Sequence, residues 1–175
     1  MTVRKERSKR SRYRLRDPFF RFWFHFVYGT GTQYDELGER AFETVSEPEL
    51  ADFVSQSFAD LCCRALRTHY PEQTITESGQ WWYDDHEIDV VGITTGETLI
   101  VGVCKFTQAP LGYDAFSKLQ DHVAELRWTP EDAHVRDETY ALFSRSGFTS
   151  AVEEAAAGRD DLDVFTAEDV VEALT

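Results

Sequence analysis

Lysine is scarce in this chain of 175 residues, whereas acidic side chains are abundant. The eighteen basic residues include only four lysines, and Asp and Glu number 32, so the formal net charge is −14. This composition is typical of proteins that remain soluble at very high salt and favours a halophilic source. Because 1 M salt screens charge over roughly 3 Å, the negative charge does not exclude a polyanionic ligand. The lysines are Lys5, Lys9, Lys105 and Lys118.

Cysteine and long apolar runs are also sparse. Cys62 and Cys63 are adjacent, Cys104 stands alone, and no Cys-x-x-Cys spacing occurs, so neither a disulfide framework nor a zinc site is predicted. The most apolar stretch, PFFRFWFHFVYG, is interrupted by Arg21 and His25 and is about half as long as a membrane span. No leader-peptide pattern opens the chain. We therefore expect a cytoplasmic protein that has no membrane association.

The phosphate-binding pattern of P-loop enzymes, G-x-x-x-x-G-K-[ST], is missing as well. The nearest stretch, GTGTQ at residues 29–33, lacks the lysine that would reach the phosphates. We expect no ATP site in this chain.

Positive charge gathers at the N-terminus. Residues 1–21 contain nine basic and two acidic side chains, and the first twelve residues contain no aromatic side chain. Residues 1–12 are predicted to form a disordered basic arm that contacts nucleic acid through its charge. Its basic residues are Arg4, Lys5, Arg7, Lys9, Arg10 and Arg12.

Residues 13–47 are predicted to form a separate segment built around an aromatic helix. Asp17 and Pro18 are typical of an N-cap and a first helical turn. Seven aromatic side chains follow within residues 19–28. Stacking on bases is one use for such a helix, but at this density we predict burial against the rest of the chain.

Residues 48–175 are predicted to form an α/β domain with a mixed sheet. A helix opens at Pro48 and ends before Pro71. The hydrophobic period then changes to two, which predicts three strands at 79–85, 86–93 and 97–106. Helices are expected at 113–128, 149–157 and 167–175, with strands at 139–146 and 162–166.

Two of these strands contain charges where apolar residues are expected. Alternation along a strand places Glu87 and Asp89 on one face, and a short turn at Gly96 would bring Asp89 near Val103 and Lys105. Two explanations compete. Asp89 and Lys105 form an ion pair, or the carboxylate holds a divalent cation beside a lysine that stabilises charge on a phosphate.

The motifs WWYDDHEIDVVGI, VCKF and LFSRSGFT, together with YRLRDPFFRFWFHFV, resemble a family. They are similar to the C-terminal domain of unknown function of archaeal DEXX-box-type P-loop ATPases, which has a PD-(D/E)XK nuclease-like core. The resemblance implies a restriction-endonuclease-like fold of helix, three-stranded meander, helix and strand. A winged-helix remnant with the aromatic helix would precede it.

The resemblance also implies site residues, and some are missing. It assigns Asp89 to the metal-binding aspartate and Lys105 to the catalytic lysine. The glutamate expected two residues before that lysine is Val103, and the helical acid is Ala59. Asp60, Glu77 or Glu87 could serve as a second ligand for Mg²⁺ or Mn²⁺, and Glu87 is the better candidate because it shares the face of Asp89; Asp60 and Gln120 are supporting candidates. A degenerate site is therefore expected, with weak or no cleavage.

Two functions follow from the resemblance. The first is a nuclease-like domain associated with DNA, encoded without the P-loop half of the ATPase. The second is a non-catalytic module that docks on a partner chain carrying the P-loop.

Overall fold

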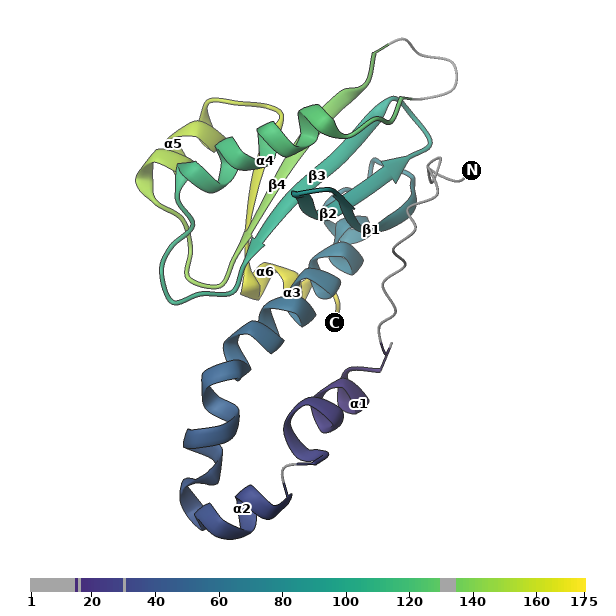
Figure 1. The fold of residues 1–175 in the computed structure, drawn as a ribbon. Coiled ribbons are helices and arrows are strands. Elements are labelled where there is room, and N and C mark those ends of the chain that lie inside the picture. Colours follow the sequence, from purple (N-terminus) through teal and green to yellow (C-terminus); the bar gives the residue numbers. More distant parts are fainter. Residues whose placement is uncertain (1–14, 16, 30, 130–134) are drawn as a thin grey trace. The chain divides into compact units, whose positions relative to one another are not determined.

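The computed structural model describes residue 15 and residues 17–29, 31–129 and 135–175 (Figure 1). The predicted arm, residues 1–12, lies outside this set. The chain divides into two compact units, one of residues up to Phe53 and one from Val54 to Thr175.

The first unit consists of short helical segments. In chain order they are α1 (Pro18–Phe22), the π-helical turn η1 (Trp23–Val27), α2 (Gly31–Leu37), the 3-10 turn η2 (Gly38–Arg40), the π-helical turn η3 (Phe42–Ser46) and the beginning of α3 (Glu47–His69). The predicted N-cap is confirmed, since the Asp17 carboxylate accepts hydrogen bonds from the backbone N–H groups of Phe19 and Phe20, at 2.8 and 3.3 Å.

The aromatic segment of this unit is less buried than its composition predicts. Phe26 is buried and packs against Phe22 and Phe53. Five of the seven aromatic side chains are exposed, so the prediction that the segment is buried is wrong for most of them. A helix that packs on one side buries only the side chains on that side, so aromatic residues all round the helix are not all buried. The exposed residues are Phe19, Phe20, Trp23, Phe24 and Tyr28.

The second unit is built on a five-stranded mixed sheet in the order β1-β2-β3-β4-β5. The first three strands, β1 (Ile75–Tyr83), β2 (His86–Thr94) and β3 (Thr98–Lys105), form an antiparallel meander. β4 (Asp137–Ser144) and β5 (Leu162–Thr166) continue the sheet in parallel with β3. The predicted α/β class with a mixed sheet is confirmed.

Helices cover both faces of this sheet (Figure 1). On one face, α4 (Tyr113–Glu125) and α5 (Ser150–Ala157) bury apolar side chains such as Phe116 and Val152 against β2, β3 and β4. On the other face, the C-terminal part of α3 and the helix α6 (Ala167–Glu172) bury Leu66 and Val170. The second unit therefore has three layers and two apolar cores.

The β2 strand departs from regular alternation near Asp89. Gly79 pairs with Val91 and Trp81 pairs with Ile88. Between these two pairs, β2 contains one residue more than β1. Such a β-bulge changes the direction of a side chain and is common beside functional sites. Ile88 and Val91 consequently pack in the same core, although strict alternation would place them on opposite faces.

Candidate functional site

A pocket of about 240 Å³ opens between the ends of β2 and β3 and the helix α4. We call it the β3–α4 pocket. It contains three of the residues that the sequence singled out, from two different strands: Glu87, Asp89 and Lys105. The full lining is Glu87 and Asp89 from β2, Gly102, Val103 and Lys105 from β3, and Asp114, Ala115, Lys118, Leu119 and His122 from α4.

Asp89 is held in the wall of the pocket by the backbone of β3. Its Oδ2 accepts a hydrogen bond from the N–H of Cys104 at 2.8 Å. The bond takes the place of a ladder hydrogen bond beyond the last pair of the two strands, Val90 and Gly102. Burial raises the pKa of the Asp89 carboxyl, whereas this N–H and the charge of Lys105 lower it. The pKa of Asp89 is raised overall, so the Cys104 N–H and Lys105 do not offset the free-energy cost of desolvating the carboxylate.

Lys105 does not neutralise Asp89 through a direct contact. The two side chains line the same pocket and interact electrostatically. However, no ion pair joins Lys105 to a carboxylate within the described part of the chain. The ion-pair explanation for these two charges is therefore not supported by the geometry.

Glu87 is tied to α4 through its main chain. His122 Nδ1 lies 2.6 Å from the Glu87 carbonyl oxygen, which can only accept, so the imidazole donates this hydrogen bond. The Glu87 side chain is exposed at the pocket and raises the pKa of Asp89 through its negative charge. Glu87 and Asp89 are thus close enough to interact, as their spacing predicts, although the bulge lies beside them.

Val103 occupies the position at which the resemblance expects a carboxylate. Its side chain is half-buried, lines the pocket and packs against the core under α4. An apolar residue therefore lines the pocket at the position where the resemblance expects an acid.

The other predicted supporting residues do not line this pocket. Ala59 is buried on α3, and Asp60 follows it on the helix that covers the opposite face of the sheet. Gln120 lies on α4, half-buried, but outside the lining. Asp60 therefore does not join Asp89 in the pocket, although both carboxylates raise the pKa of Cys63 on α3. The six basic residues of the arm lie outside the described residues.

Three polar residues of α4 complete the pocket and were not singled out from the sequence. Asp114, Lys118 and His122 follow one another at intervals of four, which places them on one face of a helix. This spacing is visible in the sequence, and so is the scarcity of lysine that makes Lys118 unusual. What the sequence does not reveal is that this face of α4 meets the ends of β2 and β3.

The donor set for a metal ion is incomplete. Across the described ranges, no group of three or more His, Cys, Asp or Glu side chains is placed to hold a metal. The pocket offers three carboxylates, those of Glu87 and Asp89 on β2 and that of Asp114 on α4, and the resemblance assigns a ligand role only to the β2 pair. A hard divalent cation prefers six or more oxygens, so water or a substrate would have to supply the rest.

The thiols near the pocket are buried rather than reactive. Cys63 Sγ donates a hydrogen bond to the Asp89 carbonyl oxygen at 3.6 Å, and burial raises the pKa of Cys63 to about 12. Burial and the neighbouring Cys62 thiol raise the pKa of Cys104 as well. Because their pKa values are raised, these thiols are protonated at neutral pH. Their role beside Asp89 is packing.

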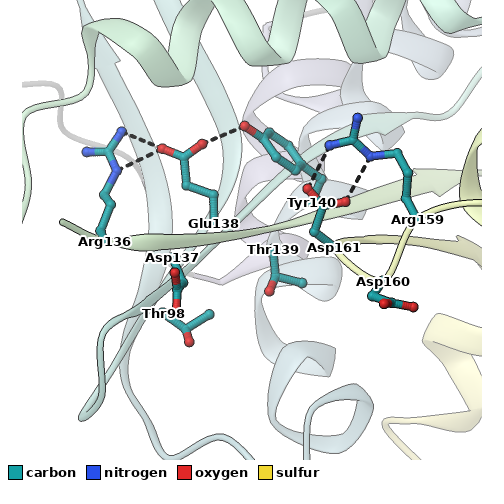
Figure 2. Close-up of a pocket in the computed structure, with 9 residues that line it drawn as sticks. All are labelled: Thr98, Arg136, Asp137, Glu138, Thr139, Tyr140, Arg159, Asp160 and Asp161. Carbon is teal, nitrogen blue, oxygen red and sulfur yellow. Dashed lines mark hydrogen bonds and ion pairs between the residues drawn. The ribbon is translucent and has the colours of Figure 1, made fainter.

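A larger hollow of about 560 Å³ lies at the opposite ends of β3 and β4. Figure 2 shows that its charged side chains are mainly occupied with one another: Glu138 binds Arg136 and accepts from Tyr140, and Asp161 binds Arg159. This hollow is at the amino ends of two parallel strands, whereas ligands of open α/β sheets usually bind at the carboxyl ends. We therefore assign the candidate site to the β3–α4 pocket despite its smaller volume.

Comparison with known proteins identifies a family and no individual relative. Neither a curated protein nor a solved structure matches the chain. Within the described residues, no helix is both long and apolar enough to cross a membrane. Residues 23–121, more than half of the chain, match the model of a family described as archaeal and bacterial proteins of unknown function. The matched region includes β1 to β3 and most of α4, and thus the whole lining of the β3–α4 pocket except His122. The chain therefore belongs to the DUF234 family of archaeal and bacterial proteins of unknown function.

Proposed function

We propose that this chain is a nuclease-like, nucleic-acid-associated domain whose metal site has lost part of its ligand set. The observation that carries the proposal is the convergence of Asp89, Lys105 and Val103, from two strands, on one pocket. A half-buried carboxylate with a raised pKa that shares a pocket with a lysine is typical of functional sites, and no ion pair of that lysine is found among the residues that the structure describes. The order of α3, the three-stranded meander, α4 and β4 agrees with a restriction-endonuclease-like core.

Two carboxylates of the pocket are the ligands that this proposal assigns to a weakly bound divalent cation. Glu87 and Asp89 would hold Mg²⁺ or Mn²⁺, which would polarise a phosphate and lower the pKa of a bound water. Lys105 lies in the same pocket and would stabilise negative charge on the phosphate oxygens. Val103 supplies no oxygen. Metal affinity is therefore expected to be low and DNA cleavage weak or absent.

Paramagnetic Mn²⁺ tests this assignment directly. Titrated into ¹⁵N-labelled protein at high salt, Mn²⁺ should broaden the amide signals of Gly102 and Cys104 before those of residues elsewhere in the sheet. Asp89→Asn should remove the effect, because it removes the carboxylate charge. Asp160→Asn is the matched control, since Asp160 is exposed and lines the other hollow.

The outcome that overturns the proposal is equally specific. If Mn²⁺ broadens signals uniformly, or if Asp89→Asn and Asp160→Asn respond alike, the pocket is not a metal site and the nuclease-like function fails.

A docking module is the second candidate function, and the exposed aromatic side chains of the first unit favour it. Phe19, Phe20, Trp23, Phe24 and Tyr28 present apolar surface that water solvates poorly. A P-loop ATPase chain is the partner that the sequence resemblance implies. Co-expression with such a chain followed by size-exclusion chromatography separates the two functions. A stable complex that Phe20→Ser and Phe24→Ser abolish, without any Mn²⁺ response at Asp89, would favour docking.

A further inference from the structure

The two lysines of the described chain, Lys105 and Lys118, line the same pocket. Lys105 ends β3, and Lys118 lies on the face of α4 that closes the pocket. Every other basic side chain in the described residues is an arginine or a histidine. Since the chain uses lysine so rarely, the meeting of two lysines from separate elements is a distinctive chemical feature of this pocket.

Within the described residues, no carboxylate neutralises either ammonium group through a direct contact. No ion pair joins Lys105 or Lys118 to a carboxylate of the residues that the structure places. Both side chains are exposed, so each ammonium can reach a ligand at the mouth of the pocket. Two like charges that face one cavity repel each other, and an anion bound between them relieves this repulsion.

The shape and charge of the pocket restrict which anion fits. Lysine is a compact charge with three donors and suits the tetrahedral oxygens of a phosphate. The carboxylates of Glu87, Asp89 and Asp114 line the same space and would oppose a bare phosphate. A divalent cation bound to Glu87 and Asp89 would neutralise these carboxylates and would attract the phosphate instead. Anion binding should therefore depend on the metal.

From the placement of both lysines on this pocket we infer that Lys105 and Lys118 together bind one phosphate group of a nucleic-acid backbone, with Lys118 as the residue that positions it. This inference rests on the proposed function, because a metal ion held by Glu87 and Asp89 would make the pocket receptive to the phosphate. It adds α4 to the site and assigns to Lys118 a role that the sequence motifs do not suggest.

The scarcity of lysine makes the test direct. Reductive ¹³C-dimethylation keeps the charge and labels only the four lysines and the terminal amine, and Lys105→Arg and Lys118→Arg assign two of the signals. In high salt with Mg²⁺, thymidylyl-(3′→5′)-thymidine, which contains a single phosphodiester, should shift the Lys105 and Lys118 signals with one shared saturation curve. Inorganic phosphate, added separately, distinguishes a backbone phosphate from a free one.

Lys118→Ala should weaken binding of this dinucleotide about tenfold, the typical loss of one charge-assisted hydrogen bond. Its Mg²⁺ affinity should not fall, because the metal ligands are untouched. Arg127→Ala removes the same charge from an exposed residue outside the pocket and should change binding less than twofold. Lys118→Arg should retain most of the affinity, since it keeps the charge.

Three results would overturn the inference while metal binding stands. They are unmoved lysine signals, equal losses in Lys118→Ala and Arg127→Ala, and a response to inorganic phosphate but not to the dinucleotide. Failure of the proposed function is seen separately, as the absence of an Mn²⁺ effect that depends on Asp89.

Discussion

At the scale of single residues, the Asp89 side chain binds a backbone N–H group, and its negative charge destabilises the folded protein. Its carboxylate accepts the Cys104 N–H, a task that an asparagine oxygen performs equally well. Its negative charge is disfavoured by burial, which raises the pKa of the carboxyl above the value in the unfolded chain. The folded protein therefore binds this proton more readily than the unfolded chain does. Stability is lost as the pH rises from about 3.8 through the folded pKa.

Asp89→Asn should accordingly stabilise the protein at neutral pH. We expect a higher Tm for the variant at neutral pH, and the difference in Tm should shrink toward zero as the pH falls toward the unfolded pKa of 3.8. Thermal denaturation of both proteins between pH 4 and pH 7, without metal, measures the difference.

Asp169→Asn provides a control of opposite sign. Hydrogen bonds from the Thr166 hydroxyl and backbone N–H lower the pKa of Asp169, so its charge is stabilising above the unfolded pKa. The asparagine variant should lower Tm at neutral pH. If Asp89→Asn is also destabilising at neutral pH, the carboxylate is structural and the cost we assign to it does not exist.

Val103→Glu should restore an oxygen ligand at the pocket. Without metal, the new charge in a half-buried strand position should destabilise the fold by about 1–4 kcal/mol. With Mn²⁺, Tm should rise with metal concentration by more than in the unmodified chain, because the ion binds the folded state. Differential scanning fluorimetry across an Mn²⁺ series detects this.

Val103→Gln is the matched variant, with a similar side chain but no charge. Equal Mn²⁺ responses of the Glu and Gln variants would contradict the degenerate-site interpretation. We expect cleavage of plasmid DNA by Val103→Glu to remain slow, because a restored ligand does not restore positioning.

At the scale of elements, α4 depends on Arg136 for its C-terminal end. The Arg136 guanidinium donates to the carbonyl oxygens of Val123, Leu126 and Trp128 and also binds Glu138, which ties the end of the helix to β4. A cation at a helix C-terminus also interacts favourably with the helix dipole. Because α4 forms one wall of the β3–α4 pocket, this contact holds the candidate site in shape.

Arg136→Met should therefore cost about 1–3 kcal/mol, since the carbonyl groups of Leu126 and Trp128 lose the Arg136 donor and that of Val123 keeps only the N–H of Leu126. It should also weaken any ligand binding at Lys118. Arg159→Gln is the comparison, because it removes a more exposed ion pair with Asp161 and should cost no more than about 1 kcal/mol. Urea denaturation monitored by tryptophan fluorescence gives both values. Similar losses in the two variants would show that Arg136 does not act as a clamp.

Most elements of the second unit were predictable because their apolar period is clear. The strand at 162–166 matches β5 at both ends, and the predicted helix at 113–128 contains α4. The convergence of Asp89, Val103 and Lys105 was also predictable from strand order. The bulge in β2 was not, since it depends on pairing with β1 rather than on a local signal. The exposed aromatic side chains of the first unit were predicted wrongly, because composition alone does not define what packs against them.

At the scale of the whole molecule, charge separates the basic N-terminal arm from an acidic remainder. Residues 4–16 contain eight basic side chains, whereas the chain from residue 22 onward has a balance of −21, from nine basic and thirty acidic residues. Affinity for DNA that comes from charge should therefore reside mainly in the arm.

Deletion of residues 1–12 removes six basic residues and should weaken DNA binding at low salt. The slope of log K against log salt should decrease by as much as about 5. Fluorescence anisotropy with a labelled 20-bp duplex measures both quantities. In the full chain, Lys118→Ala should decrease this slope by only about 1, because it removes a single phosphate contact. Unaltered binding by the truncated protein would move the main contact to the acidic remainder.

The hydrogen bond between Asp89 and the Cys104 N–H has a consequence for how other family members should be compared. The bond needs only an acceptor oxygen, so a lineage that no longer uses the charge is free to exchange aspartate and asparagine at this position, and gains stability by doing so. A lineage that keeps aspartate despite its cost is retaining the charge for another reason. The residues at positions 89, 103 and 105 should therefore divide the relatives into two groups. In one group selection maintains the charged pocket, and in the other this selection no longer acts.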